Sequence, residues 1–114
     1  MSAVEDQEKD IKTILELDDI IHSPARLAIL TFLLPRGHAP FTLIRKALGL
    51  TAGNLSSHLR KLENNDLVRI HKKFIDAKPT SIIFLNDRGR ESIIEYASNL
   101  SLVLKNMLKK TEEQ

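Results

Sequence analysis

Two short helical patterns joined by Gly49-Leu50-Thr51 constrain the fold of this chain more than any other part of its sequence. The first runs from Thr42, its expected N-terminal cap, to Leu48, and Gly49 is its expected left-handed stop. The second begins at Thr51, which can cap free backbone amides. Its apolar residues form one stripe: Leu55, Leu59 and Leu62. This arrangement predicts a helix-turn-helix over residues 42–65.

The hydrophobic period changes directly after this motif. Residues 67–74 and 81–85 are expected to form strands, with a turn around residues 76–79. From Asn86, a capping residue, a long helix is expected to run to about Lys109. The pattern predicts a mostly α-helical α+β fold, with a β-hairpin over residues 67–85 between the helix-turn-helix and the C-terminal helix.

Two further helices are expected ahead of the motif. The first covers about Asp6 to Ile21. The second begins at Ser23-Pro24, where Ser can cap the amides and Pro loses nothing at the first helical position. It should end before Pro35-Arg36-Gly37.

The C-terminal helix carries apolar residues at the four-three spacing of a coiled-coil seam. They are Ile93, Ala97, Leu100, Leu104 and Met107. Such a seam either pairs with a second copy or folds back onto its own domain, and extra apolar side chains on its flank favour a dimer. The first helix can join this interface through Ile11, Ile14 and Leu15.

Length and composition exclude several classes of protein. One unit over residues 1–114 has no room for a cofactor domain beside a substrate domain. A chain without Cys has no disulfides, thiolate metal sites or Cys nucleophiles. No apolar run approaches the roughly 20 residues of a membrane span, and the N-terminus does not read as a signal peptide, so a cytoplasmic location is expected.

Charge is divided unevenly along the chain. Residues 1–20 hold seven acids against two lysines, whereas residues 21–114 carry 15 basic and 8 acidic side chains. No acid occurs between Asp19 and Glu63. A basic body favours a polyanionic partner, although a solvated basic surface gives the same charges.

The outward face of the second helix of the motif is polar and basic. Such a helix fits a DNA major groove, because Asn, Ser and Lys side chains offer hydrogen bonds to base edges and a glycine permits close approach. The residues expected at base edges are Gly53, Asn54, Ser57 and Lys61. Those expected at phosphates or in the minor groove are Thr51, Arg60, Lys72, Lys73 and Lys78, with His58 as a half-buried partner of a backbone group or phosphate.

Each element also has a plainer interpretation. A capped surface helix is polar outside because it faces water, and basic residues on an edge hairpin deter aggregation. A helix-turn-helix with no acid before Glu63, followed directly by a basic hairpin, can however place two basic elements on one face. That order favours DNA binding.

Metal binding and catalysis have less support. The four histidines, His22, His38, His58 and His71, are scattered, so neither a metal nor another cofactor is expected. Ser57 and His58 adjoin in sequence, but helix neighbours point about 100° apart. Since no paired carboxylate or oxyanion loop accompanies them, we expect no enzymatic activity.

Three stretches resemble a known family: Ile21–Leu30, Leu48–Leu59 and Asn65–Val68. The most specific part is Leu-Thr-x-Gly-Asn-Leu-Ser-x-His-Leu before a Leu-Val strand, supported by Lys78-Pro79-Thr80. Over residues 17–104 the chain resembles small winged-helix transcriptional regulators related to the MarR and ArsR families. The resemblance implies a recognition helix from near Ala52, a wing over residues 67–85 and a homodimer formed by the terminal helices. The thiolate chemistry of ArsR-type metal sensors does not carry over, because Cys is absent.

The sequence therefore predicts a homodimeric, sequence-specific transcriptional regulator that binds double-stranded DNA. A twofold dimer would place two recognition helices in successive major grooves, about 34–36 Å apart, and predicts a palindromic operator. The alternatives are a winged helix used for protein interaction, a non-specific architectural DNA-binding protein, and a small hydrolase built on Ser57 and His58.

Overall fold

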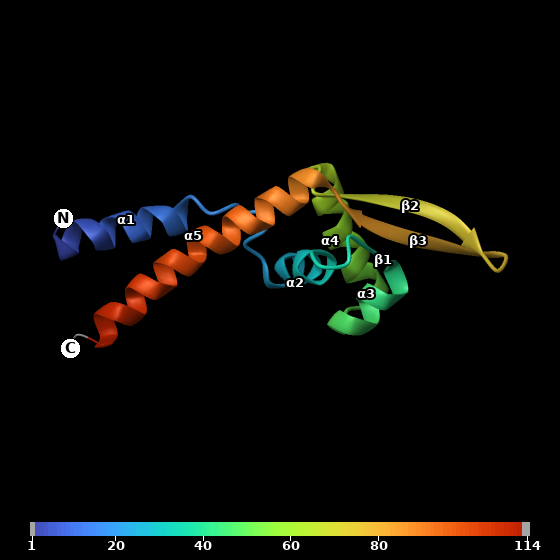
Figure 1. Cartoon of the computed structure of the whole chain (residues 1–114). Coiled ribbons are helices and arrows are strands. Elements are labelled where there is room, and N and C mark those ends of the chain that lie inside the picture. The colour runs from blue at the N-terminus through green and yellow to red at the C-terminus, as the bar shows by residue number, and fades with distance from the viewer. Residues whose placement is uncertain (1, 113–114) are drawn as a thin grey trace.

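The computed structural model describes residues 2–112 as five α-helices and one three-stranded antiparallel sheet (Figure 1). In chain order the elements are α1 (Ala3–Leu15), α2 (Pro24–Leu33), β1 (His38–Pro40), α3 (Phe41–Leu48), α4 (Ala52–Asn64), β2 (Val68–Ile75), β3 (Lys78–Leu85) and α5 (Asp87–Glu112). Helices α3 and α4 form the helix-turn-helix, β2 and β3 form the wing, and α5 is the long C-terminal helix. The predicted α+β winged-helix fold is confirmed.

The hydrophobic core lies where α2, α3 and α4 meet the base of the sheet and the first turns of α5. The stripe of α4 predicted from sequence is fully inside it. The most deeply buried side chains of the core are Ile29, Leu30, Leu33, Ile44, Leu55, Leu59, Leu62 and Ile83. Burying a side chain of this size contributes about 1.5–3 kcal/mol, so these contacts hold α4 firmly and leave only its outer face free.

Most predicted helix ends are found where capping residues stand. The Thr51 hydroxyl accepts a hydrogen bond from the Asn54 amide at 3.1 Å, and Gly49 adopts a left-handed φ of 67° after α3. Thr42 does not cap α3, which begins at Phe41 directly after Pro40 and has no side-chain cap. The reason is that β1, which pairs with β3, leads straight into the helix.

Helix α1 ends at Leu15 and not at Ile21 as predicted. The carboxylate of Asp18 accepts hydrogen bonds from the amides of Ile20 at 2.8 Å and Ile21 at 3.3 Å, which turns the chain out of the helix. Residues 16–23 instead form a linker that directs Leu17 and Ile21 into the core.

The wing covers residues 68–85, close to the predicted 67–85, but its second strand is longer than predicted and its turn is tighter. Strand β3 begins at Lys78, and a two-residue turn, Asp76 (φ 52°) and Ala77 (φ 61°), joins it to β2. Positive φ at both central residues is typical of a type I′ hairpin turn. Pro79 is tolerated in β3 because β1 pairs only with residues 82–84, which leaves β3 a free edge near the tip.

Helix α5 begins one residue after its predicted start and continues to Glu112. The Asn86 carbonyl accepts the Arg90 amide at 3.0 Å, but the Asn86 side chain donates to the Asp66 carbonyl at 3.2 Å and so ties the helix start to the end of α4. Gly89 lies buried against Leu67, where the backbone of α5 closely approaches the residue that precedes β2.

The molecule is elongated, measuring 63 × 24 × 23 Å with a radius of gyration of 17.5 Å. A compact chain of this length would have a radius near 13 Å. The difference arises because α1 and the distal half of α5 project on one side while the wing projects on the other (Figure 1). None of the helices in residues 2–112 combines the length and apolar character needed to cross a membrane.

Candidate nucleic-acid interface

The outer face of α4 is solvent-exposed over its whole length. The predicted base-edge residues Gly53, Asn54, Ser57 and Lys61 are exposed, as is Arg60. Thr51 is also exposed, at the N-terminus of α4, where free amides and the helix dipole favour an anion. This face therefore combines hydrogen-bonding side chains with positive charge.

His58 is half-buried on the flank of α4 and contacts an arginine. The Nη1 atom of Arg26 lies 3.3 Å from Nδ1 of His58. Because a guanidinium only donates hydrogen bonds, Nδ1 acts as the acceptor and the imidazole is neutral. Burial, followed by the charges of Arg26 and Lys61, lowers the pKa of His58 from its ordinary value of 6.5.

Arg26 is a positioning residue that sequence reasoning missed. Its Nε donates to the Ile20 carbonyl at 2.6 Å and its Nη2 to the Asp19 carbonyl at 3.5 Å, in addition to the His58 contact. It therefore joins the linker, α2 and α4. The available signal is an arginine in the first turn after Ser23-Pro24, where the sequence by itself indicates only a basic charge.

The wing lysines occupy different faces of the hairpin. Lys72 pairs across the hairpin with Ser81, and Ile70 pairs with the buried Ile83. Because side chains two residues apart on a strand point to the same face, Lys72 lies on the face of the sheet that is turned towards the core. Lys72 and Ser81 line a hollow of about 210 Å³ together with Arg60 of α4. Lys73 and Lys78 are exposed on the opposite face, towards the tip. The fold thus brings Arg60 and Lys72 together and keeps Lys73 and Lys78 apart from them.

Glu63 fixes the wing to α4 and was also missed. Its carboxylate accepts a hydrogen bond from the Ile70 amide at 3.1 Å. Strand β2 is at the edge of the sheet, and Glu63 supplies the acceptor that an edge strand otherwise lacks. The signal was present in the sequence, because Glu63 is the first acid after Asp19.

Apolar side chains are exposed mainly on α1 and α5. Nine of the twelve large exposed hydrophobic side chains are on these helices, including the predicted interface residues Ile11, Ile14, Leu15, Leu104 and Met107. Ala97 is exposed and Leu100 is half-buried. Ile93 is only 3% exposed and packs in the core of its own chain, which leaves little of it for a partner.

A largely apolar hollow of about 590 Å³ lies between α2 and α5 and continues this surface. Its lining includes Leu27, Leu34, Ile94, Leu100 and Leu104. On another side of α5, the side-chain amide of Asn106 donates a hydrogen bond to the carboxylate of Asp10 on α1 at 3.1 Å, and Val103 is buried. The arm formed by α1 and the distal half of α5 therefore has one side of α5 covered by α1 and another side exposed to solvent.

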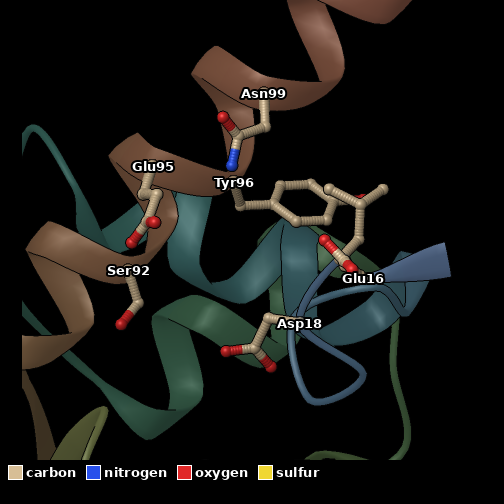
Figure 2. A pocket seen from close by; sticks show the side chains of 7 residues that line it. Glu16, Asp18, Ser92, Glu95, Tyr96 and Asn99 are labelled. Carbon is tan, nitrogen blue, oxygen red and sulfur yellow. The ribbon is translucent and has the colours of Figure 1, made fainter. Parts of the chain in front are cut away.

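A smaller polar hollow of about 270 Å³ lies between the linker and α5. Figure 2 shows the carboxylates of Glu16, Asp18 and Glu95 around it, beside the ring of Tyr96. Tyr96 shares a 2.7 Å hydrogen bond with Nδ1 of His22, and burial raises the pKa of its hydroxyl. Within residues 2–112, no three His, Asp or Glu side chains are grouped closely enough to hold a metal ion. The contacts of Asp18 and Tyr96 hold the linker in place.

Helix-turn-helix, basic wing and exposed recognition helix together define the winged-helix class of DNA-binding protein. Residues 25–104 match the winged helix DNA-binding domain family, and the chain belongs to this family. It is also 32% identical, over 88 residues, to an uncharacterised protein of Methanocaldococcus jannaschii, a match that covers 77% of this chain and 96% of the relative.

Solved structures agree with this assignment. A transcriptional regulator homologue from Pyrococcus horikoshii is 40% identical with a TM-score of 0.80, and the match covers 87% of this chain and 97% of that one. A MarR-family regulator from Silicibacter pomeroyi has the same fold at 19% identity, with a TM-score of 0.61 and coverage of 86% and 65%. The chain is therefore a small winged-helix DNA-binding protein, and MarR-family regulators share its fold.

Proposed function

We propose that the whole chain works as one DNA-binding unit, a sequence-specific regulator of transcription that binds double-stranded DNA as a homodimer. The observation that carries the proposal is the continuous face formed by the outer side of α4 and Lys72 of the wing. The Pyrococcus horikoshii homologue, described as a transcriptional regulator, supports the same role.

In this proposal α4 reads bases and the surrounding cations hold phosphates. Asn54, Ser57 and Lys61 approach base edges in the major groove, with Gly53 allowing close contact. Arg60 and Lys72 address backbone phosphates beside the same groove, and Thr51 addresses one at the helix N-terminus. Lys73 and Lys78 reach the flanking minor groove or its phosphates.

The homodimer is proposed from the exposed apolar face of the arm. Leu104 and Leu108 are 47% and 65% exposed and line the hollow between α2 and α5, whereas Met107, 54% exposed, lies on the side of α5 that faces Ile11 and Ile14 of α1. A contiguous apolar surface of this kind is unusual for a monomer and is covered if α5 packs against α5 of a second copy.

The test is a salt series of binding to duplex DNA with paired variants. We expect Lys72→Ala to weaken binding to every duplex and to reduce the slope of log affinity against log salt by about one. Lys109→Ala removes the same charge far from the DNA-contacting face of α4 and the wing. It should change neither the affinity nor the slope.

Asn54→Ala should weaken binding to the preferred duplex by about 1–3 kcal/mol and leave random duplexes almost unaffected. Asn99→Ala, an exposed asparagine on α5, serves as the control. The assigned roles would be overturned if Lys72→Ala weakened binding only to the preferred duplex and Asn54→Ala weakened binding to every duplex. Absence of binding to any duplex at low salt would favour a protein-interaction module. Binding without any sequence preference would favour an architectural role.

A further inference from the structure

The tip of the wing carries an exposed apolar pair. Phe74 is 79% exposed, more than any other large hydrophobic residue that the structure describes. It pairs across the hairpin with Pro79, which is also exposed. The turn-flanking pair, Ile75 with Lys78, is the hydrogen-bonded one in a two-residue hairpin, so Phe74 and Pro79 form the next, closely spaced pair.

This pair lies on the face of the wing that is turned towards the recognition helix. Side chains alternate along a strand, so Phe74 shares its face with Lys72 and Ile70. Ile70 and Lys72 line the hollow that also contains Ser56 and Arg60 of α4. In Figure 1 the β2–β3 ribbon extends well beyond the helices, which places its tip at one extremity of the molecule.

The surroundings of Phe74 are basic. Lys72, Lys73 and Lys78 lie within four residues of it, and Asp76 is the one acid in residues 67–86. A second copy of the tip would bring like charges together, which is destabilising. A polyanion complements the lysines, and its base stack can accept an apolar side chain.

We propose that Phe74, backed by Pro79, is a wedge that enters the minor groove of the duplex contacted by α4 and partly unstacks one base step. Apolar side chains act in this way in proteins that kink DNA from the minor groove. The wedge rests on the proposed function, because α4 and Lys72 must first hold the duplex. It adds a contact that selects easily unstacked steps outside the sequence read by α4.

Phe74→Trp provides a direct probe, because the chain has no Trp. The probe ligand is a duplex of about 30 base pairs taken from the fraction that the wild-type protein binds. We expect the emission of Trp at position 74 to be quenched by stacking and shielded from acrylamide when the duplex is added. Ile75→Trp, one residue away on the opposite face, should change much less. Equal responses at the two positions, or no response at position 74, would overturn the proposal.

A second measurement uses Phe74→Ser with Ile75→Ser as the matched control. Loss of the wedge should lower affinity roughly tenfold. It should also abolish the fluorescence increase of 2-aminopurine at the unstacked step. Because Phe74 is exposed, this variant should melt close to the wild type. Unchanged affinity and unchanged 2-aminopurine emission would overturn the wedge.

The failure of the wedge can be told apart from failure of the proposed function. If wild type binds the duplex and Lys72→Ala weakens it while Phe74→Ser does not, only the wedge is wrong. If the wild type binds no duplex, the proposed function itself is wrong. If Phe74→Ser alters the sedimentation of the free protein, the tip is a self-association surface and the wedge is overturned.

Discussion

At the scale of single residues, two helical glycines have opposite surroundings. A Cβ added to Gly89 would collide with the Leu67 carbonyl and meet Cδ1 of Leu85 at 2.8 Å, whereas one added to Gly53 would meet nothing within 4 Å. Gly89→Ala should therefore destabilise the fold by about 1–3 kcal/mol, measured by urea unfolding.

Gly53→Ala is the matched control for this prediction. It should be neutral or stabilising by up to about 1 kcal/mol, because Ala favours helix. The same variant should weaken DNA binding, since its methyl group projects from the exposed face of α4. A Gly89→Ala protein as stable as the wild type would contradict the close packing of α5 against Leu67 and Leu85.

His58 gives the stability of the free protein a dependence on pH. Its pKa is lower in the folded chain than the ordinary 6.5, so below that pH the unfolded chain binds the proton more readily. The stabilisation from the neutral contact with Arg26 is present above pH 6.5 and decreases as the pH falls below it. His58→Gln, which keeps an acceptor but does not titrate, should lose less stability between about pH 7.5 and pH 5.5 than the wild type.

The control for His58→Gln is Ser57→Ala, at an exposed neighbour on α4 that does not titrate. It should leave the pH dependence of the urea midpoint unchanged. If the stability of His58→Gln and that of the wild type had the same pH dependence, protonation of His58 beside Arg26 would not be the cause of that dependence.

At the scale of elements, the wing is held to α4 by the Glu63 carboxylate on the Ile70 amide. Glu63→Ala should accelerate hydrogen exchange of the Ile70 amide roughly fivefold, in line with a hydrogen bond worth about 1 kcal/mol. Glu63→Gln keeps an acceptor and should restore most of the protection. Equal exchange in all three proteins would show that strand pairing alone orders β2.

The elements also show how much could be predicted from the sequence. Leucine stripes and the caps Ser23, Thr51 and Gly49 located α2, α3 and α4, because helix signals are local. Strand β1 has only three residues and forms by pairing with β3, so no local pattern indicates it. The sequence predicts too broad a turn in the wing, because Ala77 adopts a positive φ that a sequence pattern normally assigns to Gly or Asn.

The candidate site also contains features that the sequence predicts and features that depend on tertiary packing. The exposure of Asn54, Ser57 and Lys61 follows from the helical period of α4. The contact of Arg26 with His58 spans 32 positions and depends on the packing of α2 against α4, which the sequence alone does not supply. Ile93 fits the four-three seam but is covered by its own domain, because the seam continues from the core into the arm.

At the scale of the whole molecule, the arm formed by α1 and α5 exposes an apolar face that we assign to a second copy. Leu104→Asp should convert a dimer into a monomer, measured by sedimentation equilibrium, because a carboxylate would be buried without a partner. Leu43→Asp is matched to it, since both leucines are 47% exposed and Leu43 lies on α3, away from the arm. A wild-type protein that sediments as a monomer at all concentrations would contradict the dimer.

In the proposed dimer, two copies of α4 read one duplex from successive major grooves. The most direct test is selection of bound molecules from a random duplex library, followed by sequencing. We expect an enriched inverted repeat whose half-sites are centred about 10 base pairs apart, with an affinity that falls steeply as salt rises. Bound DNA without any enriched sequence, or a single enriched half-site bound by one chain, would contradict it.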